Sequence, residues 1–296
     1  MQNNNLKYYS YPIRHGLISR VRDIDVKGFR KLSILLPKWL LPNPKRITES
    51  VLKTIYGFKI IINPSIDNGV ELSLFETGTY EKGILHFIES NFKSDGVFID
   101  VGANIGLMSI FTASKFPKSK VIAFEAHPNT VELLNRNVEL NGIQNIEVFD
   151  KALGNAIGKI KIFDNWQVNR GGASTVVQGK DSKSFEVDLI RLDDTLNDLI
   201  PDMIKVDVEG AELDVLKGAE GLIKRFLPTL IVEISDLREK TQSESIEIVE
   251  YIKSLGEYQI FKLKGGKERK SKLVEVLNHQ DLPEHDNIIC IAKKDS

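Results

Sequence analysis

A strand, a glycine turn and a helix are encoded in one stretch, Val97-Phe-Ile-Asp100-Val-Gly102-Ala-Asn-Ile-Gly106-Leu107. The run from Val97 to Ile99 is apolar and rich in β-branched and aromatic residues, which is typical of a strand buried on both faces. After the two glycines, apolar residues resume with helical spacing. This order brings backbone N–H groups and a helix N-terminus close to a ligand. We therefore expect a ligand site at the carboxyl end of this strand.

The glycine spacing distinguishes two kinds of nucleotide site. In G-x-G-x-x-G, counted from Gly102, the later glycines would fall where Asn104 and Leu107 stand, so the dinucleotide fingerprint is absent. The spacing is D-x-G-x-x-x-G, which is similar to the first motif of methyltransferases that use S-adenosylmethionine (SAM). Asp100 can help to bind the cationic methionine part of that cofactor. A nicotinamide-dependent oxidoreductase is therefore disfavoured.

The composition is that of an ordinary folded chain. The 296 residues are 42% hydrophobic and 27% charged, which is enough to bury a sizeable core. The net charge of −1 is uneven: residues 1–53 carry eleven Lys and Arg against three acidic residues, or +8, which leaves −9 for the remainder. There is no secretory signal or apolar run of bilayer length, and the single cysteine, Cys290, lies in an apolar run. We expect a cytoplasmic protein.

The basic N-terminal segment has two interpretations. Residues 1–25 are polar and lack a clear period, which predicts a lead-in with little regular structure. Between Val26 and Leu41, Trp39 and several leucines alternate with basic residues, as they do in helices that lie in a membrane interface, although Pro37 should interrupt such a helix. An arm that is solvated or packs on its own domain, and an arm that makes peripheral membrane contact, both stay open.

The rest of the chain is predicted to form an α/β fold. Residues 55–62 and 71–75 have the pattern of two strands joined by a turn. From residue 97 onward, strands alternate with helices, which indicates a doubly wound, mostly parallel sheet. Two closing strands, over 258–263 and 287–292, are expected to pair with each other and to add an antiparallel strand at the sheet edge.

Three parts follow from this organisation. We predict a basic N-terminal arm over residues 1–44, a lid module that leads into the core over residues 45–95, and the ligand-binding α/β domain over residues 96–296.

Acidic residues follow the next two strands of this domain. Glu125 comes a little over twenty residues beyond Gly102, where an acid can hydrogen-bond both ribose hydroxyls of an adenosine. Asp150 follows the third strand and could accept from an adenine amine, but backbone groups of Lys151 and Ala152 could serve equally well. The sequence leaves these two alternatives for adenine open.

The densest polar cluster is Lys205-Val-Asp207-Val-Glu209-Gly210. Side chains alternate along a strand, so Lys205, Asp207 and Glu209 point the same way if the strand extends that far. Three charges at the end of a buried strand are costly to desolvate unless they are paired or used. The histidines, including His285, show no such clustering and are expected to be ordinary surface or packing residues.

Several motifs together resemble the FkbM family of SAM-dependent methyltransferases. They are Gly78-Thr-Tyr80-Glu81, Asp100-Val-Gly-Ala-Asn-Ile-Gly106, Phe124-Glu125-Ala-His-Pro128, Leu134-Asn-Arg-Asn137, Ala152-Leu-Gly154 and Ile204-Lys-Val-Asp-Val-Glu-Gly-Ala-Glu212. Two positions depart from the family pattern, because His127 stands where Asn or a similar residue is expected and Ser235 where His is common.

The resemblance implies a class I SAM-methyltransferase fold, which is Rossmann-like, for residues 96–296. It also implies SAM as the cofactor and O-methylation of a hydroxyl on a sugar, a glycan or a secondary metabolite. The residues that we expect to hold the cofactor are Tyr80, Glu81, Asp100, Gly102, Ala103, Asn104, Gly106, Glu125, Ala126, Asp150, Lys151, Ala152 and Asp207. Residues 171–175, which are rich in glycine, are expected to border the acceptor.

The expected catalytic residues are Lys205, Asp207 and Glu209. Methyl transfer to a hydroxyl requires removal of a proton, so we expect Asp207 or Glu209 to be the general base and Lys205 to orient the carboxylates. A variant places Mg²⁺ between Asp207 and Glu233 at the ends of adjacent strands.

Two rival functions stay open. One is a SAM- or nucleoside-binding protein without turnover, which would not depend on the Lys205 cluster. The other is a nucleic-acid methyltransferase, which the basic arm favours. The fourth strand of the α/β domain, however, is not followed by an Asn/Asp-Pro-Pro-Tyr motif that would present a flipped base. We therefore expect a small-molecule or glycan acceptor and no nucleic-acid partner.

Overall fold

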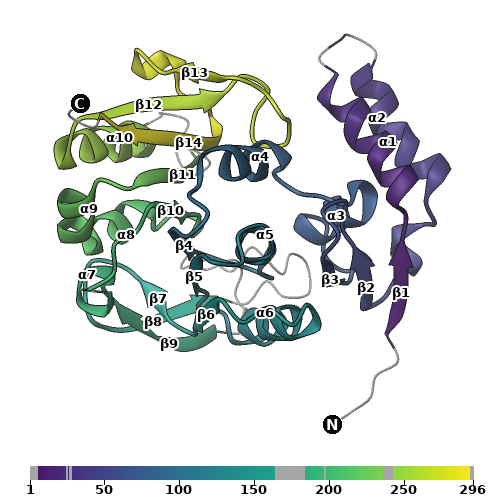
Figure 1. Ribbon diagram of the computed structural model, residues 1–296, viewed down its shortest axis with the longest axis horizontal. Helices are drawn as coiled ribbons and strands as arrows, with labels where there is room; N and C mark the ends of the chain where they lie inside the picture. Colours follow the sequence, from purple (N-terminus) through teal and green to yellow (C-terminus); the bar gives the residue numbers. More distant parts are fainter. Residues whose placement is uncertain are drawn as a thin grey trace.

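The structure is a computed structural model that describes residues 6–24, 26, 29–163, 184–196, 198–235 and 243–293. An eight-stranded sheet forms its centre, with the strand order β13-β12-β14-β11-β10-β4-β5-β6 (Figure 1). The strands are β4 (Val97–Val101), β5 (Lys120–Phe124), β6 (Ile146–Phe149), β10 (Met203–Val206), β11 (Thr229–Ser235), β12 (Tyr258–Leu263), β13 (Leu273–Glu275) and β14 (His285–Ala292).

The sheet is mostly parallel. Strands β6, β5, β4, β10 and β11 run in one direction, and β14 runs antiparallel between β11 and β12. The predicted doubly wound α/β fold is confirmed, and the closing strands pair with each other as expected.

Helices cover both faces of the sheet. One face packs against α4 (Lys82–Asn91), α5 (Leu107–Lys115) and α6 (Pro128–Leu140), and the other against α8 (Glu212–Gly218), α9 (Glu220–Phe226) and α10 (Ser243–Leu255). Successive strand residues enter different cores because strand side chains alternate: Phe98 lies in the first core and Ile99 in the second. A smaller sheet of β7 (Ala152–Leu153), β9 (Ser184–Ile190) and β8 (Gly158–Phe163) follows β6, and the short helix α7 (Leu192–Thr195) comes after it. A second short helix, η2 (His279–Asp281), lies between β13 and β14 in the chain.

The strand order reverses between β4 and β10. From β4 the chain proceeds to β5 and β6 on one side, then returns to β10 on the other. Ligands of open α/β sheets bind at such a switch point, at the carboxyl ends of the strands. Gly102 makes the turn there with φ +79, and a Cβ on it would lie 1.8 Å from the carbonyl oxygen of Asp207. A residue with a side chain therefore does not fit.

The N-terminal part forms a second sheet and a helical hairpin. Strands β1 (Lys7–Ser10), β2 (Ser50–Lys53) and β3 (Lys59–Ile62) pair in that order, β1 parallel and β3 antiparallel to β2. Helices α1 (Pro12–Asp23) and α2 (Phe29–Leu40) pack together, and α1 also packs on α3 (Val70–Thr77) (Figure 1). A short helix, η1 (Pro44–Arg46), precedes β2. None of the helices in the described ranges combines the length and apolar content that a membrane span needs.

Two predictions for the N-terminal arm are wrong. Its described residues form β1 and α1 rather than an irregular lead-in, because β1 pairs with a distant strand and Ile18 is fully buried in the core. Helix α2 also continues through Pro37, and the N–H of Leu41 donates to the carbonyl of Pro37 at 2.9 Å. Whether residues 1–44, 45–95 and 96–296 act as separate parts stays a prediction.

The predicted strand over residues 71–75 is also wrong, because these residues belong to α3. The carboxylate of Asp67 accepts from the backbone N–H groups of Gly69 and Glu71 at 2.8 and 3.0 Å, which caps the start of the helix. Leu74 and Phe75 are then buried on the inner face of the helix. An Asp shortly before the apolar run was the helix signal that the strand interpretation overlooked.

Candidate active site

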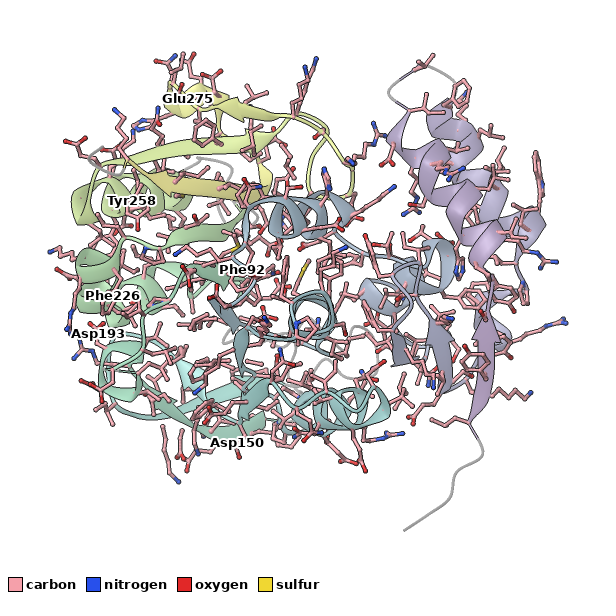
Figure 2. All side chains as sticks on the ribbon, in the orientation of Figure 1. Phe92, Asp150, Asp193, Phe226, Tyr258 and Glu275 are labelled. Carbon is pink, nitrogen blue, oxygen red and sulfur yellow. The ribbon has the colours of Figure 1, made fainter. Side chains whose placement is uncertain are left out.

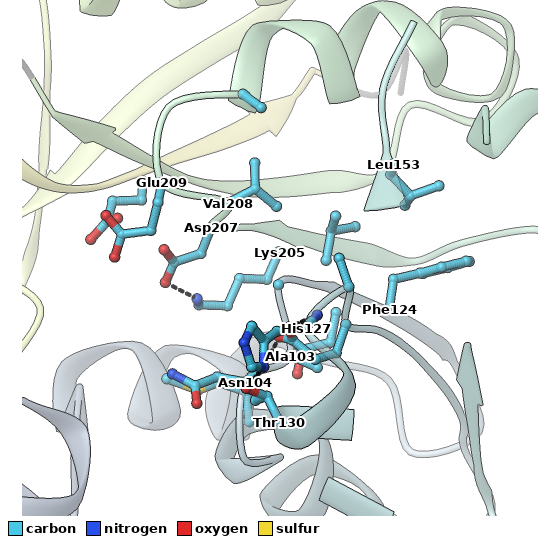
Figure 3. Close-up of a pocket in the computed structure, with 18 of the residues that line it drawn as sticks. Ala103, Asn104, Phe124, His127, Thr130, Leu153, Lys205, Asp207, Val208 and Glu209 are labelled. Atoms are coloured by element: carbon cyan, nitrogen blue, oxygen red, sulfur yellow. Dashed lines mark hydrogen bonds and ion pairs between the residues drawn. The ribbon is translucent and has the colours of Figure 1, made fainter. Parts of the chain in front are cut away.

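A cavity of about 300 Å³ opens at the carboxyl ends of β4, β5 and β10 (Figure 3). It brings together most of the predicted site residues, from segments that are far apart in the sequence. Those that line it are Tyr80, Glu81, Asp100, Gly102, Ala103, Asn104, Glu125, Ala126, Lys151, Ala152, Lys205, Asp207 and Glu209.

Asp100 presents a buried carboxylate at the end of β4. Its Oδ2 accepts from the hydroxyl of Ser109 at 2.6 Å, whereas Oδ1 has no hydrogen-bond partner among the described residues. Burial raises the pKa of this carboxyl group, and the ammonium of Lys205 opposes the shift. A buried oxygen without a partner is costly, so an acceptor at this point suits a ligand that can donate to it.

Glu125 is fixed by two backbone groups. Its Oε2 accepts from the N–H of Asn104 and its Oε1 from the N–H of His127, both at 2.9 Å. Each carboxylate oxygen has further lone pairs, so the group can still accept from a ligand that carries two hydroxyls. His127, one of the departures from the family pattern, is a buried packing residue whose ring meets Phe185 edge-on at 5.0 Å.

Lys205 and Asp207 form a tight ion pair, with 2.6 Å between Nζ and Oδ2 (Figure 3). Burial acts to lower the pKa of Lys205, but the carboxylates of Asp207, Glu81 and Asp100 raise it overall. Burial acts to raise the pKa of Asp207, and the Lys205 ammonium nevertheless lowers it. The pair is therefore ionised at neutral pH.

Glu209 does not continue the row of Lys205 and Asp207. Strand β10 ends at Val206, and Glu209 adopts a left-handed backbone conformation with φ +55 before Gly210 turns the chain toward α8. The side chain of Glu209 is exposed and lies on the cavity lining beyond the strand end. The three charges would share a face only if the strand extended to residue 209, and it does not.

A second buried lysine lies opposite the first. Lys267, in the loop between β12 and β13, forms ion pairs with Glu233 and with Glu81, whose Oε1 is 3.1 Å from Nζ. The carbonyl of Lys267 accepts from the N–H of Gly83 at 2.8 Å, and the Glu268 carboxylate accepts from the N–H of Glu81 at 3.3 Å. The loop is therefore tied to the start of α4. Nothing in the sequence marked Lys267, which stands in a polar loop far from every motif.

Three carboxylates of this cluster are close enough to hold a metal ion. Ligand oxygens of Glu81, Asp207 and Glu233 all lie within 4.8 Å of one another. The ammonium groups of Lys205 and Lys267 already contact these same three carboxylates. Burial and the charge of Asp207 raise the pKa of Glu233, so this part of the cluster retains a proton more readily than an ordinary carboxylate.

His285 is exposed, as expected for a surface residue, but its position relative to the site was not predicted. It lines the cavity, and its Nε2 lies 3.9 Å from Oε1 of Glu233. Burial and the nearby Lys267 lower its pKa, which keeps the imidazole neutral at pH 7. His285 is also the β-sheet partner of Ser235, the position at which the family pattern has a histidine. The strand pairing that brings it to the site is not visible in the local sequence.

Two predicted residues lie outside the cavity lining. Gly106 is the N-cap of α5 with φ +92, and a Cβ there would lie 2.3 Å from Leu134, so turn geometry and packing account for this glycine. Asp150 is exposed at the periphery of the molecule and lies 3.4 Å from Lys151 Nζ (Figure 2). Of the two alternatives for adenine, the lining favours Lys151 and Ala152. Residues 171–175 fall outside the described residues.

A doubly wound sheet with an acid and a glycine turn at its switch point, and a second acid one strand away, defines a nucleotide-type site of the class I methyltransferase kind. The sequence family described as the methyltransferase FkbM domain matches residues 100–258. The chain belongs to this family and is a SAM-dependent methyltransferase.

Several named proteins are similar to parts of this chain. Methyltransferase sdnD of Sordaria araneosa is 30% identical over 178 residues, which are 49% of this chain and 68% of the relative. Hexuronic acid methyltransferase AglP of Haloferax volcanii is 27% identical over 157 residues, 52% of this chain and 62% of AglP. The crystal structure of methyltransferase FkbM from Methylobacillus flagellatus KT is 18% identical with a TM-score of 0.43, and the match covers 94% of this chain and 57% of that one.

Proposed function

We propose that this protein transfers a methyl group from SAM to a hydroxyl of a sugar, a glycan or a secondary metabolite. One observation carries the proposal: the buried Lys205–Asp207 ion pair shares a cavity with Asp100 and Glu125. Asp100 and Glu125 can recognise a cationic adenosyl ligand, and the neighbouring Lys205–Asp207 pair can bind a hydroxyl.

The residues present fit SAM, which supplies an electrophilic methyl carbon when it is bound. The unpartnered Oδ1 of Asp100 suits its cationic methionine part, and Gly102 lets the backbone approach closely. The oriented carboxylate of Glu125 suits two ribose hydroxyls. Backbone groups of Lys151 and Ala152 border the adenine, and Tyr80 with Glu81 borders the methionine end.

The polar cluster then binds the acceptor hydroxyl and removes its proton. Asp207 is held by Lys205 and accepts a hydrogen bond from the hydroxyl, which orients the oxygen for attack. Because its pKa is lowered, Asp207 is a weak final acceptor of the proton. His285 is neutral at pH 7 and lines the same cavity, which makes it the stronger candidate for general base. Glu209, at the exposed rim, is the remaining alternative.

In this proposal the ammonium groups of Lys205 and Lys267 neutralise the clustered carboxylates, and methyl transfer does not require Mg²⁺. A magnesium ion between Asp207 and Glu233 would have to displace at least one ammonium group from its carboxylate partner. Mg²⁺ also needs near-octahedral oxygen coordination, which three carboxylates that are already paired do not supply.

The acceptor class has support from one relative. The name of AglP states a hexuronic acid as its substrate, and a sugar hydroxyl is a weak acid of the kind that needs a general base. A nucleic-acid acceptor has less support, because Val208-Glu209-Gly210 stands after β10 in place of an Asn/Asp-Pro-Pro-Tyr motif.

The test is methyl transfer from isotope-labelled SAM to a panel of sugar nucleotides, uronic acids, glycolipids and aliphatic polyols. We expect one acceptor class to gain a labelled methyl ether, located by mass spectrometry. Asp207→Asn should lower kcat at least 100-fold with SAM affinity retained, and His285→Gln should alter the acidic limb of the pH–rate profile, where protonation of a general base stops the reaction. Asp150→Asn is the matched control, since Asp150 is exposed and lies outside the lining.

Two outcomes would contradict the proposal. Full activity of Asp207→Asn removes this residue from the reaction. Micromolar SAM binding without transfer to any acceptor, nucleic acid included, favours the non-catalytic binding protein.

A further inference from the structure

We propose that the exposed faces of α1 and α2 bind the surface of an anionic phospholipid bilayer. The outer face of α2 is formed by residues 31, 34, 35, 38 and 39, which lie on one side of an α-helix. Two of them are lysines, and the others are Ile34, Leu35 and Trp39. Ile34 is 58% exposed and Trp39 is 68% exposed. Large apolar residues interleaved with lysines on a helix face are the pattern of interfacial helices.

Helix α1 presents a similar face. Ile13, Leu17 and Arg20 follow one another at intervals of four and three residues, which brings them to the same side of the helix, and Ile24 comes directly after the last helical residue. Ile13 is 86% exposed, and Leu17 and Ile24 are also exposed. The opposite side of α1 carries the fully buried Ile18, so the helix already has a separate apolar face for its own core.

The apolar exposure is concentrated at this hairpin. Thirteen large apolar side chains are exposed in the described part of the chain, and eight of them lie between residues 13 and 39. Single exposed apolar residues are normal on a protein surface, whereas a cluster of them marks an interaction site. The hairpin lies at one side of the molecule, beyond α3 and away from the central sheet, so a flat surface can approach it (Figure 1).

Charge identifies the occupant as anionic. Residues 1–53 carry a net charge of +8 in a chain whose net charge is −1. The two acidic residues in the described part of this segment do not offset that charge locally, because each is paired with a cation of the body: Asp23 with Lys82, and Glu49 with Arg136. An apolar face within a basic segment complements a lipid surface that has acyl chains below and negative headgroups above.

The test uses the full chain and vesicles of phosphatidylcholine with or without phosphatidylglycerol, in a flotation assay. We expect binding to the anionic vesicles that weakens with added salt, and little binding to the neutral ones. Lys31→Gln with Lys38→Gln should reduce the partition coefficient roughly 30-fold, at about fivefold per charge. Ile34→Ser with Leu35→Ser and Trp39→Ser should reduce it at least tenfold.

The matched controls lie elsewhere on the surface. They are Lys118→Gln with Lys264→Gln, and Ile157→Ser with Leu277→Ser; all four side chains are exposed, Leu277 to 73%. Circular dichroism verifies that each variant is folded. In a Trp166→Phe background Trp39 is the only tryptophan, so a blue shift of its emission with anionic vesicles reports directly on the face.

The outcomes separate the proposal from its alternatives. Vesicle binding that falls in both hairpin variants and not in the controls supports it. No binding at low salt, or equal losses in hairpin variants and controls, overturns it. Concentration-dependent dimerisation that the Trp39 variant abolishes, without vesicle binding, assigns the face to a second copy of the chain and also overturns it. None of these readouts depends on methyl transfer.

Discussion

Replacement of Gly102 by alanine should damage the junction between β4 and β10. A left-handed conformation costs an L-residue about 1–2 kcal/mol, and Gly102 has φ +79. The added Cβ would also lie 1.8 Å from the carbonyl oxygen of Asp207, so that carbonyl has to move by at least 1.2 Å to reach the 3.0 Å limit of real contacts. The same peptide segment donates from Asp207 N to the carbonyl of Val101 at 3.0 Å, and this hydrogen bond must weaken.

We expect Gly102→Ala to lower the free energy of unfolding by about 3–5 kcal/mol. The movement also displaces Asp207 from Lys205, so activity should fall about 100-fold, as it does for errors near 1 Å in a reacting group. Gly142→Ala is the matched control, because Gly142 also has positive φ, +63, but has nothing within 4 Å of an added Cβ. Gly142→Ala should lower the free energy of unfolding by only about 1 kcal/mol. Urea denaturation measures both variants, and equal stability losses would refute the steric argument.

Three further predictions concern the polar cluster. Lys205→Met leaves buried carboxylates without their cation, so it should lower the free energy of unfolding at pH 7 by about 3–5 kcal/mol, as measured by urea denaturation. The exposed Lys293→Met should lower it by less than about 0.5 kcal/mol, and equal losses in the two variants would contradict the pairing. Burial and Glu81 raise the pKa of Glu268 to about 7 in the folded protein, whereas its pKa in the unfolded chain is near 4.5. The protonated group therefore stabilises the fold most below pH 4.5, and this contribution is lost as the pH rises through 7. The free energy of unfolding should fall by at most about 3 kcal/mol from pH 4.5 to 8, and Glu268→Gln should make it less dependent on pH in this range. An unchanged pH dependence in Glu268→Gln would argue against a contribution from Glu268. Activity should survive EDTA, whereas a loss that Mg²⁺ restores would reinstate the metal.

The sequence predicted the parts of the site that are local in the chain. Asp100 and Gly102 stand within one strand–turn–helix unit, and Lys205 and Asp207 stand on one strand, so spacing alone placed them correctly relative to each other. Glu125 followed because the carboxyl ends of adjacent parallel strands meet at one edge of a sheet.

The remainder of the site depends on contacts between distant segments. Lys267 reaches Glu81 only because its loop folds back onto the start of α4, and His285 reaches Glu233 through the register of β14 on β11. Neither contact leaves a periodic or compositional signal. The error at residues 71–75 had a different origin, since a short apolar run suits either a strand or a buried helix and the Asp67 cap decided between them.

Calorimetric titration with SAM and S-adenosylhomocysteine tests the central claim most directly, with NAD as the comparison ligand. We predict micromolar binding of both adenosyl ligands and none of NAD. Glu125→Ala should weaken SAM binding at least tenfold, because its oriented carboxylate receives the ribose, while the exposed Glu147→Ala should not. Failure of the folded wild-type protein to bind either adenosyl ligand, or equal binding by Glu125→Ala, would contradict the assignment of this cavity as the cofactor site.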